Sequence, residues 1–190
     1  MKICVFCGSN RGRNPAFVDM AQKLGKEIAL RRQTLVYGGG SIGIMGAIAN
    51  AALAAKGEVI GIMPNFLIEQ EIYHPGITQL IRVETMSERK TKMMNLCDAF
   101  VVLPGGIGSL EEFFEVFSGS QLSLHNKPIF IFNIDDFYTP ILQMIHNVVD
   151  EGFAPEVDKG LVIPVQTVEE MYAALPTFTH RVGKKHENSI

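Results

Sequence analysis

Short apolar runs alternate along the chain with longer segments in which apolar residues recur at helical spacing. The runs predict buried β-strands at residues 2–7, 33–37, 58–63, 77–83, 99–103, 127–133 and 160–164. The longer segments predict helices at residues 14–30, 41–55, 85–96, 109–121, 138–151 and 168–174. Asn14, Ser41 and Thr85 are the expected N-caps of the first three helices. Residues 65–76 look irregular, with one helical turn that would contain Glu69 and Glu71.

This alternation predicts an α/β fold: a Rossmann-like, doubly wound, mainly parallel sheet with helices on both faces. We expect one nucleotide-binding domain over residues 1–176 and a flexible C-terminal tail over residues 177–190. Ligands of such sheets bind at the carboxyl ends of the strands. Three loops of small residues follow predicted strands, at Gly8-Ser9-Asn10, Gly38-Gly39-Gly40 and Pro104 to Gly108. The sequence therefore predicts one cleft that these loops share.

Composition and charge exclude several classes of function. The chain has 190 residues, is 47% apolar, and carries a net charge of -3, which offers no basic surface for nucleic acid. No apolar run approaches the roughly 20 residues of a membrane span, and no signal peptide is evident, so we expect a cytoplasmic protein. Cys4 and Cys7 form a C-x-x-C pattern, but they lie on a predicted strand with side chains on opposite faces. Buried structural cysteines are favoured over a redox pair.

Cofactor and metal motifs are weak or absent in the sequence. Gly38-x-Gly40-x-x-Gly43 has the dinucleotide spacing, but the next predicted strand ends without the acidic residue that an NAD site needs. Neither glycine loop continues into the Gly-Lys-Ser/Thr of a Walker loop. The five histidines show no metal-ligand spacing, and His74, near Glu71, is the one that we single out. We therefore expect no cofactor and no metal.

The segment from residue 98 to residue 121 combines a strand, a glycine loop and a helix. This order forms an anion site, because glycine lets backbone amides approach a ligand and the first helical turn adds unpaired donors. Within the helix, an apolar stripe is predicted to pack and an acidic arc to face outward or into a cleft. The stripe comprises Leu110, Phe113, Phe114 and Phe117, and the arc comprises Glu111, Glu112, Glu115 and Ser118.

Two interpretations of Glu112 remain open at this stage. Ser109 to Glu112 forms an S-x-x-E capping box, in which the glutamate only returns to the N-cap amide; the alternative is a catalytic carboxylate beside the phosphate site. Arg89 lies early in its predicted helix, where the dipole disfavours a cation. We therefore expect it to have an anionic partner, either a ligand phosphate or a carboxylate such as Glu112. Lys92 is interpreted as part of a solvated face.

Two motifs resemble those of the LOG ("lonely guy") family, the nucleoside 5′-monophosphate phosphoribohydrolases that activate cytokinins. Pro104-Gly105-Gly106-Ile107-Gly108-Ser109-Leu110-Glu111-Glu112 resembles the family's P-G-G-x-G-T-x-x-E signature, and Met86 to Lys90 resembles its M-x-x-R-K segment. Similar blocks lie around Cys7 to Ser9, Tyr37 to Gly46 and Gln121 to Pro128, so the resemblance covers roughly three quarters of the chain. Members are often labelled "lysine decarboxylase", yet no lysine here has an evident pyridoxal phosphate setting.

The resemblance implies hydrolysis of the N-glycosidic bond of AMP or an N6-substituted AMP to free base and ribose 5-phosphate. It implies catalytic roles for Glu112 and Arg89, and a homodimer. The substrate-binding residues that it implies are Ser9, Gly39, Gly40, Glu71, Lys90, Pro104, Gly105, Gly106, Ile107, Gly108, Ser109, Leu110, Glu111 and Ser118. Ser109 replaces the usual threonine, Ile107 a frequent aromatic residue and Gly119 the tryptophan of plant members, so the sequence leaves the preferred base open.

Other functional classes make different predictions. A non-catalytic nucleotide or molybdenum-cofactor carrier would share the fold and the glycine loops but would release no adenine from AMP. An NAD oxidoreductase would show a nicotinamide-dependent absorbance change. From the sequence, Glu112→Gln should fold normally and lose AMP hydrolysis, and Arg89→Ala should lose turnover with little change in melting temperature.

Overall fold

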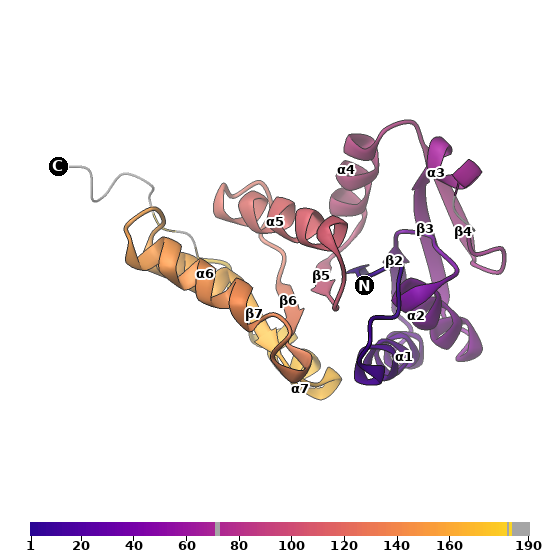
Figure 1. Cartoon of the computed structure of the whole chain (residues 1–190), viewed down its shortest axis with the longest axis horizontal. Helices are drawn as coiled ribbons and strands as arrows, with labels where there is room; N and C mark the ends of the chain where they lie inside the picture. The colour runs from indigo at the N-terminus through magenta and orange to yellow at the C-terminus, as the bar shows by residue number, and fades with distance from the viewer. Residues whose placement is uncertain (71–72, 182, 184–190) are drawn as a thin grey trace.

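The computed structural model describes residues 1–70, 73–181 and 183, in which strands and helices alternate from end to end (Figure 1). The strands are β1 (Lys2–Phe6), β2 (Thr34–Tyr37), β3 (Glu58–Pro64), β4 (Gln79–Val83), β5 (Ala99–Val102), β6 (Ile129–Phe132) and β7 (Val162–Val165). The α-helices are α1 (Pro15–Leu30), α2 (Gly43–Ala54), α3 (Asn65–Gln70), α4 (Met86–Leu96), α5 (Ile107–Gln121), α6 (Thr139–Asp150) and α7 (Val168–Ala174). Short 3-10 turns span Ile134–Asp136, Glu156–Leu161 and Leu175–Thr177.

All neighbouring strands of the seven-stranded sheet are parallel, in the order β4-β3-β2-β1-β5-β6-β7. Strand β1 is paired on one side with β2 and on the other with β5, so the strand order reverses beside β1. Helices α1, α2 and α7 pack on one face of the sheet, and α4, α5 and α6 on the other. The predicted Rossmann-like fold with helices on both faces is confirmed.

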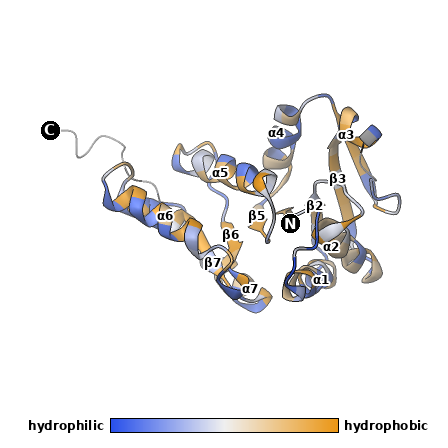
Figure 2. Ribbon diagram, in the orientation of Figure 1, coloured by the Kyte–Doolittle hydropathy of each residue, from blue (hydrophilic) through white to orange (hydrophobic). Residues whose placement is uncertain are grey.

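The strands are apolar on both faces because both faces are covered. Alternate residues of β1 enter different cores: Ile3 and Val5 pack beneath α1 and α2, whereas Cys4 and Phe6 pack toward α4 and α5. In the hydropathy colouring, apolar residues gather along the strands and polar residues on the outer helix surfaces (Figure 2). Cys4 and Cys7 lie on opposite faces as predicted, and both are free and buried.

The helix starts agree with the sequence predictions in two cases out of three. Asn14 caps α1 by accepting a hydrogen bond from the amide of Ala16 at 3.0 Å, and Thr85 caps α4 by accepting one from the amide of Glu88 at 3.1 Å. The prediction for Ser41 is wrong, because α2 begins at Gly43 and its N-cap is Ile42, which makes no side-chain capping bond. Residues 65–70 form α3, a longer helical segment than the single turn predicted.

Two of the predicted segments, residues 65–76 and the tail from residue 177, are described only in part. Glu71 lies outside the described residues. His180, in the predicted tail, contacts α5, where its Nε2 atom lies 3.1 Å from the Oγ atom of Ser120. The boundary between the domain and the tail stays a prediction. Across the described ranges, no helix is both long and apolar enough to cross a membrane.

Candidate active site

Three loops meet at the carboxyl edge of the sheet, where the strand order reverses. The amide of Gly8, after β1, donates to the carbonyl of Pro104, after β5, at 3.1 Å. The carbonyl of Gly8 accepts from the amides of Ile44 and Met45 at the start of α2, at 3.1 and 3.2 Å. Gly8 thus connects the loops that follow β1, β2 and β5. The shared position predicted for the three loops is the switch point at which doubly wound sheets bind ligands.

Two glycines in these loops have no room for a side chain. Gly43 has a φ of +64°, and a Cβ atom there would lie 2.2 Å from the carbonyl oxygen of Ser9. At Gly105, a Cβ atom would lie 2.1 Å from the Oγ atom of Ser109. Only glycine therefore allows the backbones of the β1, β2 and β5 loops to approach one another this closely.

Helix α5 starts earlier than predicted, and this rules out the capping-box interpretation of Glu112. Its N-cap is Gly106, which makes no side-chain capping bond, and its first residue is Ile107. Ser109 and Glu112 therefore both lie inside the helix and are buried, so the predicted capping box does not form. The amides of Ile107, Gly108 and Ser109 belong to the first turn, which has no acceptors within the helix, and they present donors and the positive end of the dipole to the cleft.

The buried face of α5 differs from the predicted apolar stripe. It consists of Ser109, Glu112, Phe113, Val116, Gly119 and Ser120, whereas Leu110 and Phe117 flank it. Phe114 is 41% exposed, so its place in the stripe was predicted wrongly. The prediction erred because it followed hydrophobicity alone: Glu112 and Phe113 both turn inward, which leaves Phe114 on the outer side of the helix. The carboxylate of Glu112 consequently lies on the inner side of the helix.

Glu112 faces Arg89 in this buried setting. The Oε1 atom of Glu112 lies 3.6 Å from the Nη1 atom of Arg89, and about a tenth of each side chain is exposed. The arginine also donates from Nε to the carbonyl of Ile62 at 2.9 Å and from Nη2 to the carbonyl of Gly38 at 3.3 Å. Arg89 therefore links α4 to the ends of β2 and β3 and to α5. Of the two partners predicted for Arg89, the carboxylate is the one present.

The surroundings of Glu112 raise its pKa from 4.5 to about 7. Burial is the main cause, since it disfavours the charged form, and the carboxylates of Glu111 and Glu115 act in the same direction. The cations of Arg89 and Lys90 oppose this rise. Near neutral pH both protonation states of Glu112 are populated, which suits a group that exchanges protons with a substrate or water.

These residues surround a cavity of about 300 Å³ at the loop edge. Of the predicted site residues, it is lined by Ser9, Arg89, Gly106, Ile107, Gly108, Ser109, Glu111 and Glu112. Met45, Leu67 and Met86, from α2, α3 and α4, give the cavity an apolar part. The cavity thus combines backbone donors, one ion pair and an apolar wall, and it can hold an anion at one end and a flat apolar group at the other.

The other predicted site residues lie outside the lining of this cavity. Lys90 forms ion pairs with Glu111 and Glu115, so its charge is already compensated. The carbonyls of Gly39 and Gly40 accept hydrogen bonds from the amide of His74 and the hydroxyl of Tyr37. Leu110 packs on the core. The substrate roles assigned from the sequence stay predictions for all of these residues.

Pro104 and Gly105 line a second, smaller cavity of about 270 Å³, which shares Gly8, Ser9 and Gly106 with the first. It lies on the side of the glycine loop that faces the start of α1 and the loop before α6, with Phe17 and Phe137 in its wall. The loop from Pro104 to Gly106 therefore separates two hollows.

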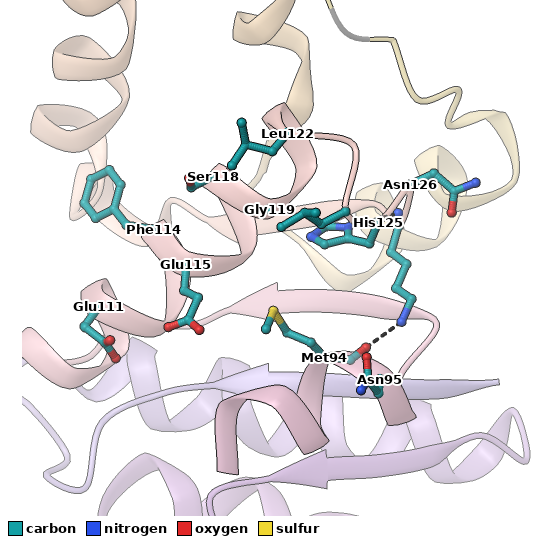
Figure 3. Close-up of a pocket in the computed structure, with 12 residues that line it drawn as sticks. Met94, Asn95, Glu111, Phe114, Glu115, Ser118, Gly119, Leu122, His125 and Asn126 are labelled. Atoms are coloured by element: carbon teal, nitrogen blue, oxygen red, sulfur yellow. Dashed lines mark hydrogen bonds between the residues drawn. The ribbon is translucent and has the colours of Figure 1, made fainter. Parts of the chain in front are cut away.

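Ser118 lies on a third surface, a groove of about 890 Å³ between α5, the end of α4 and the loop before β6 (Figure 3). Glu111 and Glu115 point to the same side of α5, and Phe114, Ser118 and Leu122 follow along the outer part of that helix. Glu111 lines both this groove and the main cavity. This groove and the main cavity therefore meet at Glu111.

The structure adds site residues that the predictions did not include, above all Leu67 and Gly38. Leu67 belongs to α3, a segment that the sequence suggested was mostly irregular, so no signal marked it. Gly38 belongs to a glycine run that the sequence marked, but its contact with Arg89 could not be predicted. A Cβ atom at Gly38 would lie 2.2 Å from the Nη2 atom of that arginine. Within the described residues, no three His, Cys, Asp or Glu side chains gather where they could hold a metal ion.

Comparison with known proteins places this geometry in a family. The profile of a family described as "Possible lysine decarboxylase" matches residues 45–175. A cytokinin riboside 5′-monophosphate phosphoribohydrolase, LOG, of Oryza sativa subsp. japonica is 41% identical over 177 residues, which cover 93% of this chain and 73% of the relative. The cytokinin riboside 5′-monophosphate phosphoribohydrolase of Rhodococcoides fascians is 42% identical over 174 residues, 91% of this chain and 88% of the relative.

A solved structure shares the fold at lower identity. It is the molybdenum cofactor binding protein of the phototrophic bacterium Rippkaea orientalis, with a TM-score of 0.71, 20% identity, and coverage of 93% of this chain and 95% of that one. Identity this low supports the shared fold alone. The two phosphoribohydrolases are about twice as similar, and each alignment covers most of this chain and most of the relative. Together with the matching profile, they show that this chain belongs to the LOG family of phosphoribohydrolases.

Proposed function

We propose that this protein is a nucleoside 5′-monophosphate phosphoribohydrolase that hydrolyses the N-glycosidic bond of AMP or an N6-substituted AMP. The observation that supports it best is the carboxylate of Glu112, buried inside the first turns of a helix whose own free amides face the same cavity. A phosphate on those amides would leave the ribose beside Glu112. The names of the relatives at about 40% identity support the same activity.

The reaction follows from this placement. The amides of the first turn of α5 bind the 5′-phosphate, and the apolar wall of Met45, Leu67 and Met86 receives the base. The bond between C1′ and the base nitrogen breaks with its electron pair on the base, and the sugar develops positive charge that the Glu112 carboxylate stabilises. The oxygen of a water molecule bonds to C1′. Glu112 takes one water proton, and the base gains one proton in the course of the reaction.

Arg89 has a positioning part in this scheme. Its Nε and Nη2 atoms are fixed by two backbone carbonyls, so its Nη1 atom presents a fixed positive charge to Glu112. This charge favours the carboxylate over the neutral acid and offsets part of the effect of burial. Without Arg89, a larger fraction of Glu112 would be protonated at neutral pH and unable to accept a proton.

The test is base release from a panel of nucleotides: AMP, N6-isopentenyl-AMP, GMP, CMP and deoxy-AMP, with products separated by liquid chromatography. We expect free base from AMP or its N6-substituted form, and loss of that activity in Glu112→Gln. Glu151→Gln, at an exposed position after α6 that lines none of the three hollows, serves as a matched control. A protein that binds these nucleotides and releases no base from any of them would be a carrier, and the proposal would be wrong.

We also propose that the protein is a cytoplasmic homodimer. Phe114, Leu122 and Leu124 are 41%, 52% and 77% exposed along the groove beside α5, and such a surface supports association with a second copy. Three free cysteines support a reducing compartment. Light scattering should give the mass of a dimer, and Leu124→Asp should give that of a monomer; a parent protein that is monomeric at micromolar concentration would contradict the proposal.

A further inference from the structure

Tyr138 is one of the most deeply buried side chains, and its hydroxyl reaches the glycine loop from outside the motif. It is 1% exposed and precedes α6, where the side chain of Asn133 accepts a hydrogen bond from its amide at 2.7 Å. Its hydroxyl donates to the carbonyl of Leu103 at 2.8 Å. Leu103 is the last residue before the loop that begins at Pro104. The tyrosine therefore contacts the backbone at the point where strand β5 turns into the loop.

The backbone of Gly105 acts on the same hydroxyl. Burial raises the pKa of Tyr138, and the nearby backbone of Gly105 opposes part of this rise. Tyr138 thus donates a hydrogen bond to the residue before Pro104 and lies near the residue after it. A phenol is protonated at neutral pH in any case, so the O–H donor to Leu103 is present there.

A second hydrogen bond also holds this loop: the amide of Gly8 donates to the carbonyl of Pro104 at 3.1 Å. Gly105 lines the smaller cavity but not the main one. The donors that face the main cavity therefore begin at Gly106. Their direction depends on how Pro104 and Gly105 are held.

We propose that Tyr138 is a positioning residue for the phosphate site: it orients the Pro104–Gly105 turn so that the amides from Gly106 to Ser109 point at a 5′-phosphate. The proposal rests on the function proposed above for the identity of the ligand. It assigns Tyr138 no contact with substrate.

The test is Tyr138→Phe, which keeps the buried ring and removes the hydroxyl. We expect the Kd for AMP, measured by calorimetry with Tyr138→Phe added to Glu112→Gln so that AMP is not cleaved, to rise about tenfold. The Kd for adenosine, measured by ligand-observed NMR at millimolar concentration, should stay within twofold of Glu112→Gln alone. A general loosening of the fold would weaken both ligands alike, and that result would overturn the proposal, as would an unchanged Kd for AMP.

Tyr172→Phe is the matched control. Its hydroxyl also donates a hydrogen bond, to the side chain of Gln33 at 2.6 Å, in a half-buried site that lines none of the three hollows described above. We expect both Kd values to be those of Glu112→Gln alone. If Tyr138→Phe does not fold, Asn133→Ala removes the bond that holds the backbone of Tyr138, and the same selective loss for AMP is expected; equal losses for AMP and adenosine would again overturn the proposal. Because the variants are compared in the Glu112→Gln background, these binding measurements do not depend on turnover. A parent that binds AMP without cleaving it would contradict the proposed function and still leave the test of Tyr138 valid.

Discussion

The substitution Glu112→Gln separates the electrostatic cost of a buried carboxylate from its catalytic use. Glutamine has nearly the same shape but does not ionise. In the parent, the pKa of Glu112 is raised from 4.5 to about 7, so the folded protein binds an extra proton between these values. Stability that depends on this group is therefore present at low pH and is lost as the pH rises through about 7. The variant lacks this loss.

The magnitude follows from the size of the pKa rise. Each pKa unit corresponds to about 1.4 kcal/mol, so between pH 5 and pH 8 the parent should lose about 2–3 kcal/mol relative to the variant. For a domain of this size, that difference corresponds to roughly 5–10 °C in Tm. The absolute stability of the variant also reflects the loss of the partner of Arg89, so the change with pH is the informative quantity.

The assay is chemical denaturation of both proteins in the same buffers at pH 5, 6, 7 and 8. Titration of all other groups is common to the two proteins and cancels in the difference between their free energies of unfolding. We expect this difference to shift steadily in favour of the variant as the pH rises. A difference that stays constant from pH 5 to pH 8 would refute the argument that burial controls Glu112.

The remaining predictions concern the neighbours of Glu112. Arg89→Ala should unfold more easily by about 3–5 kcal/mol in denaturant titrations and lose base release, because it leaves Glu112 and two buried carbonyls without a partner; a variant as stable as the parent would contradict the linking role of Arg89. Gly38→Ala should displace the guanidinium and lower kcat/KM at least tenfold, whereas Gly160→Ala, where a Cβ atom meets nothing within 4 Å, should match the parent. Lys90→Ala should change the free energy of unfolding by less than about 1 kcal/mol, since its partners are half-exposed; a loss above about 2 kcal/mol would show that the ion pairs matter more than their exposure suggests. The kcat/KM of the parent for AMP should rise with pH through about 7, as Glu112 becomes a carboxylate, and a profile that falls over that range would assign it the acid form.

Much of the fold could be predicted because strands buried on both faces give continuous apolar runs, as in the β5 segment from Ala99 to Val102. The edge at which the ligand loops meet also followed from the alternation of strands and helices. Helix starts were less predictable. Ser109 and Glu112 have the spacing of a capping box, yet α5 begins at Ile107 with Gly106 as its N-cap, so both residues lie inside the helix.

The burial of charged residues was the feature that was hardest to predict from the sequence. The sequence indicated an anionic partner for Arg89 but not its burial. Because Arg89 is buried and donates to the carbonyls of Gly38 and Ile62, we now expect Arg89→Ala to lose stability, in place of the little change in melting temperature expected from the sequence. Tyr138 gave no signal at all, since its role depends on the approach of the β6–α6 connection to the β5 loop. Such contacts between distant segments arise from topology, and local periodicity contains no information about them.

The central claim is that Glu112, on the helix whose amides face the same cavity, cleaves the bond between base and ribose. Its most direct test is incubation of AMP with parent protein and with folded Glu112→Gln at pH 7.5, with adenine and ribose 5-phosphate both quantified. The account predicts equal amounts of the two products from the parent and at least about a hundredfold less from the variant. Equal product from both proteins, or adenine without ribose 5-phosphate, would contradict it.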